Sequence, residues 1–92
     1  MAEKVDFYLY PRAFVPIIDI IGVISIKNSK GKWKENLILD AFRVIDIAYY
    51  FNARLCKETV IPERIEPETY RYVCFSLKFH SMRRMYDFLK CM

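Results

Sequence analysis

Hydrophobic and polar residues alternate with period two near the C-terminal end of the chain, over residues 70–79. One side of this pattern carries Val73, Phe75, Leu77 and Phe79, and the other carries Tyr70, Tyr72, Cys74, Ser76 and Lys78. Successive side chains of a strand point to opposite faces of a sheet. The pattern therefore predicts a strand with one face on a core and an open, aromatic and slightly basic opposite face.

Three other segments have the patterns of strands. Residues 5–10 alternate in the same way and stop at Pro11, which predicts a short strand. Residues 17–27 are rich in β-branched side chains and predict a central strand, in which Gly22 marks a bulge or a close approach of backbone. A short edge strand is expected at residues 58–61.

Two helices are expected. Residues 34–55 contain no glycine or proline, and Asp40, Arg43 and Asp46 follow one another at a spacing of three that favours ion pairing. Most of this helix surface is apolar, so we expect it to be buried on more than one side. Ser81 is a good N-cap for a final helix. The apolar stripe expected on that helix consists of Met82, Met85, Tyr86 and Leu89.

The order strand, strand, helix, strand, strand, helix predicts one α+β domain over residues 1–92, since the chain is too short for two. It is the order of a ferredoxin-like domain in which an N-terminal strand replaces the last strand. The expected sheet is four-stranded and antiparallel, in the order first, second, fourth, third. Both helices are expected on one face, which leaves the other face bare.

Composition favours a partner surface and an intracellular setting. The apolar fraction is 54% and the aromatic fraction 16%, so some apolar area is expected in a homodimer interface. Cys56, Cys74 and Cys91 show no CxxC spacing and no secretion signal precedes them, which predicts free buried thiols and a cytoplasmic location. No run of about 20 uncharged apolar residues is present to cross a membrane. The lack of glutamine with many charges is a thermophile-like bias.

The open face of the predicted sheet is the first candidate site. Its proposed binding residues are Tyr8, Tyr10, Tyr70, Tyr72 and Lys78. Such a face suits a protein interface or nucleic-acid stacking, while β-propensity alone also favours tyrosine in strands. Residues 68–75 share aromatic positions with the first ribonucleoprotein motif of RNA-recognition domains, but lack its basic and small residues, so no family is assigned.

A lysine-rich turn is the second candidate site. Its residues are Lys27, Lys30, Lys32, Trp33 and Lys34. Lysines can neutralise phosphates, and an indole can stack on a base. The alternative is a solvated turn in which Trp33 covers the start of the following helix.

Catalytic chemistry has little support in the sequence. His80 is the only histidine and is expected at the surface, and Asp19 is expected to lie in a loop rather than to be a buried acid. No metal-ligand spacing, cofactor motif or small-molecule site is recognisable. We therefore expect a non-enzymatic, homodimeric binding protein, an adaptor or inhibitor of viral or mobile-element type. The alternative is a nucleic-acid-binding module.

Overall fold

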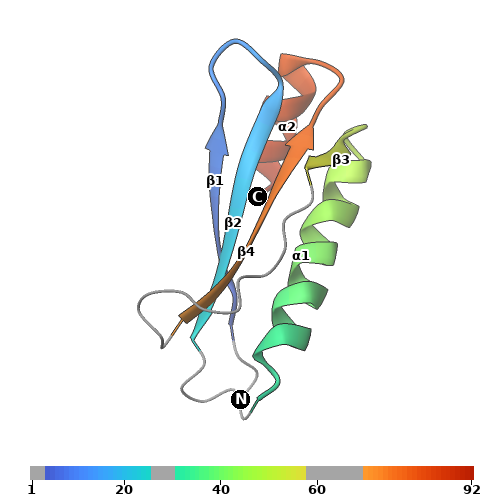
Figure 1. Ribbon diagram of the computed structural model, residues 1–92. Coiled ribbons are helices and arrows are strands. Elements are labelled where there is room, and N and C mark those ends of the chain that lie inside the picture. Colours follow the sequence, from blue (N-terminus) through green and yellow to red (C-terminus); the bar gives the residue numbers. More distant parts are fainter. Residues whose placement is uncertain (1–3, 26–30, 58–69) are drawn as a thin grey trace.

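The computed structural model describes residues 4–25, 31–57 and 70–92, and its elements follow the predicted order (Figure 1). They are β1 (Asp6–Pro11), β2 (Ile17–Ser25), α1 (Trp33–Tyr49), β3 (Arg54–Lys57), β4 (Tyr70–Lys78) and α2 (Met82–Cys91). The predicted α+β class, with a four-stranded antiparallel sheet and two helices, is confirmed.

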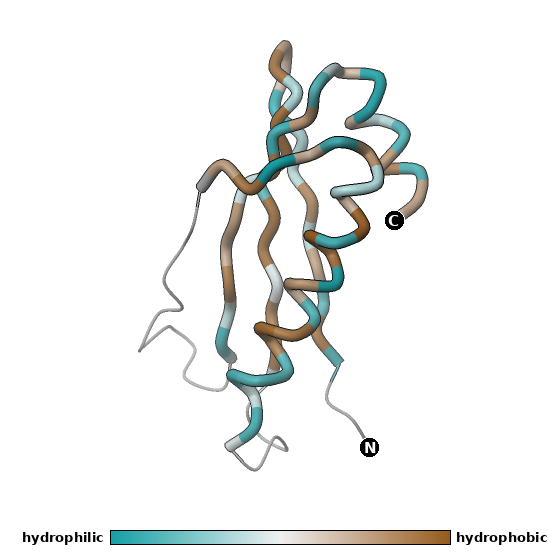
Figure 2. Tube along the Cα trace, turned by 90° about the vertical axis from the view of Figure 1, so that its right-hand side faces the viewer, coloured by the Kyte–Doolittle hydropathy of each residue, from teal (hydrophilic) through white to brown (hydrophobic). Residues whose placement is uncertain are grey.

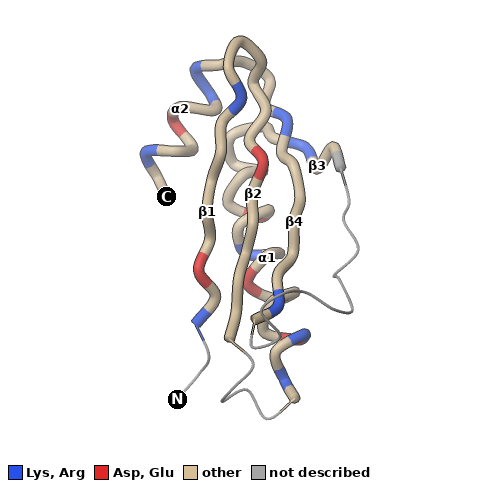
Figure 3. The backbone as a smooth tube through the Cα atoms, turned by 60° about the vertical axis from the view of Figure 1, so that its left-hand side comes forward, with Lys and Arg blue, Asp and Glu red and all other residues tan. Residues whose placement is uncertain are grey.

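The strands pair in the order β1-β2-β4-β3, and every neighbouring pair is antiparallel. Figure 3 shows α1 running behind β2 and β4, and Figure 1 shows α2 behind the upper part of β2. The two long strands, β2 and β4, are therefore central, and β1 and β3 form the edges.

Two backbone hydrogen bonds establish which amides of the sheet face which neighbour. The amide of Arg12 donates to the carbonyl of Ile17 at 2.9 Å, and the amide of Phe79 donates to the carbonyl of Pro16 at 2.7 Å. Because bonded and non-bonded pairs alternate along an antiparallel ladder, the amides of Phe7 and Leu9 point away from β2. Pro11, which has no amide hydrogen, occupies the same outward-facing position at the end of β1.

The core lies between the sheet and the helices. On β4 the predicted inward residues Val73, Phe75 and Leu77 are buried, and Phe79 just beyond the strand is buried with them. The predicted stripe of α2 needs one correction, because Tyr86 is exposed and Phe88 is fully buried in its place. Residues three apart on a helix share a face, so Met85 and Phe88 point into the core together. The remaining buried hydrophobic residues are Val5, Ile18, Ile20, Ile24, Leu37, Ala41, Val44, Ala48 and Ala53.

Gly22 marks a close approach rather than a bulge. It lies directly opposite Phe7 in the β1–β2 register. A Cβ atom at Gly22 would lie 2.6 Å from Cε1 of Phe7 and 3.2 Å from Cγ1 of Val73. The missing side chain therefore makes room for the Phe7 ring.

The helix α1 ends six residues earlier than predicted. Asn52 adopts a left-handed backbone with φ of 61°. Its amide donates to the carbonyl of Tyr49 at 3.0 Å, and the amide of Ala53 donates to that of Ala48 at 3.1 Å. These two bonds form a Schellman motif, which terminates a helix and turns the chain. The third strand consequently begins at Arg54, while the expected strand at 58–61 lies outside the described residues.

The outer side of α1 is apolar and exposed, so within one chain this helix is buried on one side only. Leu39, Phe42, Tyr49 and Tyr50 are exposed there, opposite the buried stripe that contains Ala41. Figure 2 shows hydrophobic segments recurring along the length of this helix. The expectation of burial on several sides is therefore not met by the described elements.

The hairpin between β1 and β2 carries an exposed aromatic side chain in an unusual backbone conformation. Phe14 has φ of 68° and is 96% exposed. Left-handed backbone is uncommon for a bulky side chain. The hairpin is held at its base by the Arg12–Ile17 and Pro16–Phe79 hydrogen bonds described above.

Candidate functional site

The side chains of β1, β2 and β4 that point away from the helices form one continuous surface, here called the open face. Its residues are Asp6, Tyr8, Tyr10, Ile17, Asp19, Ile21, Val23, Ser25, Tyr70, Tyr72, Cys74, Ser76 and Lys78. They share this face because side chains alternate along each strand and the register aligns the alternation across the sheet. No helix of the described chain covers this surface.

The middle of the open face is apolar. Ile21 lies between Tyr8 on β1 and Cys74 on β4, and Val23 lies beside Tyr72 in the next row. Ile21, Val23 and Tyr72 are half-buried by their neighbours, while Tyr8 is 49% exposed. The centre therefore presents branched aliphatic side chains with a tyrosine on either side.

One end of the open face is polar, and the charges of Arg12 and Asp19 there neutralise one another. Nε of Arg12 donates to Oδ2 of Asp19 at 2.9 Å, and Nη2 donates to Oδ1 at 3.0 Å. The hydroxyl of Ser76 donates to Oδ1 of the same carboxylate at 2.6 Å. The hydrogen bonds and the negative charge of Asp19 raise the pKa of the Arg12 guanidinium. This bidentate pair joins the hairpin to the central strands.

The expectation that Asp19 lies in a loop is wrong. It stands within the β2–β4 pairing, near one end of β2 and directly opposite Ser76. Its side chain is 41% exposed, so it is not a buried acid either. A carboxylate is tolerated at this strand position because Arg12 reaches it from the adjoining hairpin.

The predicted binding residues divide between two parts of the molecule. The structure brings together on the open face Tyr8, Tyr10, Tyr70, Tyr72 and Lys78. Lys32, Trp33 and Lys34 lie instead at the start of α1, in the helix layer. Lys27 and Lys30 lie outside the described residues. The two candidate sites of the sequence thus do not form one surface among the described residues.

Trp33 packs against the protein rather than projecting from it. It is half-buried and contacts the hydrophobic core. The guanidinium carbon of Arg71 lies 5.5 Å from the centre of the indole ring, which is a cation–π distance. This is the arrangement expected if Trp33 covers the start of the helix.

Three residues of this region were not among the predicted binding residues: Ile21 and Val23, which belong to the open face, and Arg12, which pairs with Asp19 at its end. The signal for the two aliphatic residues was present, because alternation within residues 17–27 assigns odd-numbered residues to one face. An almost wholly apolar strand hides this assignment, since either set could face the core. Arg12 could not be found from the pattern, because its position depends on the shape of the hairpin.

Cys56 and Cys91 are exposed and Cys74 is half-buried, so the expectation that the thiols are buried is wrong. Within the described ranges, no three His, Cys, Asp or Glu side chains are arranged to hold a metal ion. In the same part of the chain, neither helix is long and apolar enough to cross a membrane. No protein-family model matches this sequence, and no curated protein or solved structure matches it significantly.

Proposed function

We propose that this chain is a non-enzymatic protein-interaction domain that forms a homodimer through its open face. The observation that carries the proposal is the apolar centre of that face, where Ile21 and Val23 lie between Tyr8 and Tyr72. Apolar residues with aromatic neighbours are typical of the cores of protein interfaces. The charge nearest to this centre on β1 is Asp6, which lies opposite Val23 at the edge of the sheet.

The register allows a face-to-face contact of two copies. Tyr8 and Tyr72 lie on opposite sides of the Ile21–Val23 pair, one row apart. A two-fold axis in the plane of the interface, perpendicular to the strands, can place Ile21 of one copy over Val23 of the other, with Tyr72 over the second copy's Cys74. In a two-fold dimer each such contact is made twice.

The expected affinity is moderate. Full burial of one large apolar side chain contributes about 1.5–3 kcal/mol, and eight such side chains would meet in the dimer. Three of the four in each copy are already half-buried, so the gain is roughly half of the full sum, about 6–12 kcal/mol. Loss of translational and rotational freedom costs about 4–15 kcal/mol. At the favourable ends of both ranges the net gain is about 8 kcal/mol, which corresponds to a micromolar dimer. We expect its interface to bury roughly 1,200 Å² in total.

We also propose that the fold is a ferredoxin-like variant in which β1 takes the place of the usual last strand. The order β1-β2-β4-β3 supports this assignment. A small domain with a bare sheet face suits an adaptor or an inhibitor that acts by covering a surface of another protein. The dimer would then be its resting state.

Light scattering across a concentration series tests the proposal. The wild-type protein is expected to change from monomer to dimer in the micromolar range, and Ile21→Lys is expected to remain monomeric. Leu39→Lys is the matched control, because it places the same charge on the exposed outer side of α1. Circular dichroism confirms that both variants are folded.

Three outcomes contradict the proposal. A wild-type protein that stays monomeric at high micromolar concentration shows that the open face does not bind a second copy. Loss of the dimer in Leu39→Lys but not in Ile21→Lys moves the interface to α1. A dimer unaffected by either change lies elsewhere on the molecule.

A further inference from the structure

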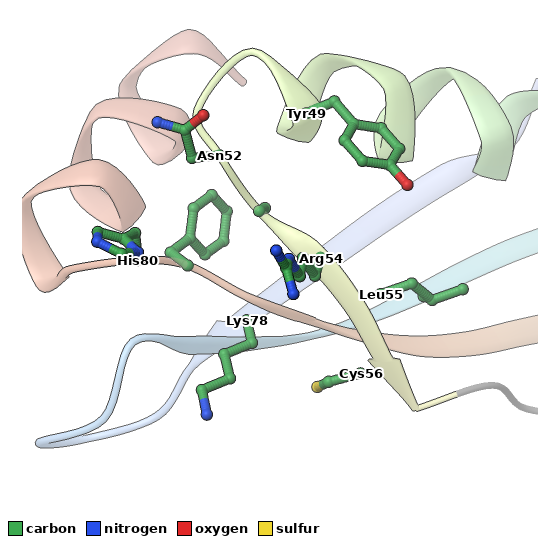
Figure 4. A pocket seen from close by; sticks show the side chains of 9 residues that line it. Tyr49, Asn52, Arg54, Leu55, Cys56, Lys78 and His80 are labelled. Atoms are coloured by element: carbon green, nitrogen blue, oxygen red, sulfur yellow. The ribbon is translucent and has the colours of Figure 1, made fainter.

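A groove lies beside the open face, between the end of α1, β3 and the end of β4 (Figure 4). Its volume is about 790 Å³, which is within the range of roughly 300–1,000 Å³ found for ligand sites. Figure 4 shows Tyr49 at one end of the groove and His80 at the other, with Arg54 and Lys78 between them.

Two cations face one another across adjacent strands in this groove. Arg54 and Lys78 are directly opposite in the β3–β4 register, and both are exposed. Like charges at directly opposed positions destabilise a sheet. The ion pairs found in the described part of the chain, Arg12–Asp19 and Arg43–Asp40, include neither residue. His80 adds a third basic side chain to the same lining.

Arg12 differs from Arg54 and Lys78 because its charge is paired with that of Asp19. Arg12 is nearby but is held by two hydrogen bonds from its guanidinium to Asp19. Figure 3 shows further Lys and Arg positions at this end of the molecule, where the β1–β2 hairpin, β3 and the start of α2 lie. The described charges around the groove are therefore mainly basic, and an anion placed between Arg54 and Lys78 would relieve their repulsion.

The remaining lining supplies an aromatic ring and an amide. Tyr49 is 62% exposed, so one side of its ring is free to stack against a planar group. Asn52 is fixed by the Schellman motif that ends α1, and it lines the groove. A side-chain amide offers both a donor and an acceptor, which can bind the edge of a base.

We propose that this groove binds a nucleotide unit. A phosphate lies between Arg54 and Lys78, and the base stacks on Tyr49 with its edge toward Asn52. The nucleotide can be a free molecule or part of a single strand, because both offer the same phosphate and base. Lys78 belongs to both the open face and the groove, whereas Ile21 and Val23, the centre of the proposed dimer contact, take no part in the groove.

Fluorescence anisotropy with a labelled single-stranded oligonucleotide tests the site. Tyr49→Ala is expected to weaken binding by about 5- to 150-fold, the equivalent of about 1–3 kcal/mol for loss of one stacked base, and Tyr49→Phe is expected to retain it. Arg54→Gln and Lys78→Gln are each expected to weaken binding and to reduce the salt slope by about one. Lys34→Gln removes one charge from the start of α1, outside the groove, and is the matched control.

Two further arms distinguish the source of the nucleotide and the kind of attraction. Adenosine monophosphate, followed by NMR shifts of the groove residues, identifies a free nucleotide as ligand, whereas binding of the oligonucleotide alone identifies a strand. Heparin, a polyanion that carries no bases, measures the part of the affinity that comes from charge alone. Oligonucleotide binding is measured below the protein concentration at which light scattering detects a dimer, which separates this test from that of the dimer.

The proposal is overturned if neither nucleotide probe binds at low salt. It is also overturned if Tyr49→Ala binds as tightly as the wild type, or if heparin binds as tightly as the oligonucleotide, because the attraction is then charge alone. Equal losses from Lys34→Gln and Lys78→Gln would likewise show that the groove has no special role. Thermal unfolding verifies that each variant is folded.

Discussion

The ring of Phe7 fills the space above Gly22, and this contact makes a glycine necessary in the middle of a buried strand. Gly22→Ala is expected to destabilise the protein by about 1–3 kcal/mol, because the new methyl group would overlap the ring. Urea denaturation monitored by circular dichroism measures the loss.

The second substitution Phe7→Leu provides the control for this prediction. If the steric account is correct, Gly22→Ala costs less in a Phe7→Leu background than in the wild type, since the two residues are in contact. Simple additivity of the two changes would show that the ring is not the cause.

The two faces of β4 have different roles, and one substitution on each face separates these roles. Phe75→Ala removes a buried ring and is expected to cost about 3–5 kcal/mol, enough to unfold much of a small domain. Tyr72→Ala lies on the open face and is expected to cost far less in the monomer while weakening the dimer. Thermal unfolding at low protein concentration and light scattering at high concentration measure the two effects. A Tyr72→Ala variant that unfolds as a monomer would show that the open face is not a free surface.

Phe14 has a backbone conformation that its side chain disfavours, yet the ring is almost wholly exposed. The left-handed conformation costs roughly 1–2 kcal/mol for a residue with a Cβ atom, and glycine avoids that cost. Part of the gain is lost because glycine is freer in the unfolded chain. Phe14→Gly is therefore expected to raise the free energy of unfolding by up to about 1 kcal/mol. Chemical denaturation checks this, and a loss of stability would mean that the ring makes a contact on which folding depends.

At the scale of elements, the end of α1 controls where β3 begins. Asn52 provides the left-handed residue of the Schellman motif, and Arg54 follows two positions later. Asn52→Ala is expected to cost about 1 kcal/mol, because alanine pays the left-handed penalty without a side chain that can hydrogen-bond locally. Asn52→Gly is expected to be at least as stable as the wild type. Thermal unfolding ranks the three proteins, and equal stability of the alanine and glycine variants would argue against the motif.

Sequence patterns were sufficient to predict β4 and α2 but not the end of α1. The strand at residues 70–79 and the helix after Ser81 were predictable, because period-two alternation and an N-cap are local signals; Ser81 indeed accepts a hydrogen bond from the amide of Arg84. The end of α1 was not predictable in this way, since residues 50–55 contain no glycine or proline. The sequence does not distinguish an asparagine in the left-handed conformation from a helical one. The start of β3 at Arg54 was therefore assigned to the helix.

At the scale of the whole molecule, the sheet order followed from the number of elements and the short β1–β2 connection. The candidate sites followed only in part. The alternation of β1 and β4 placed the tyrosines on the open face, but the nucleotide groove unites residues from α1, β3 and β4 that no single pattern connects. Arg54 and Lys78 are 24 residues apart in the chain and become neighbours only through the β3–β4 register.

The edge of the sheet at β1 offers a means to decide how two copies meet. The amides of Phe7 and Leu9 point away from β2, whereas those of Tyr8 and Tyr10 are bonded to it. In the monomer we therefore expect hydrogen exchange to alternate along β1, fast at Phe7 and Leu9 and slow at Tyr8 and Tyr10. Face-to-face pairing leaves this alternation intact, while addition of a partner strand at the edge would slow exchange at all four amides. Uniformly fast exchange in the monomer would show that β1 is not held in this register.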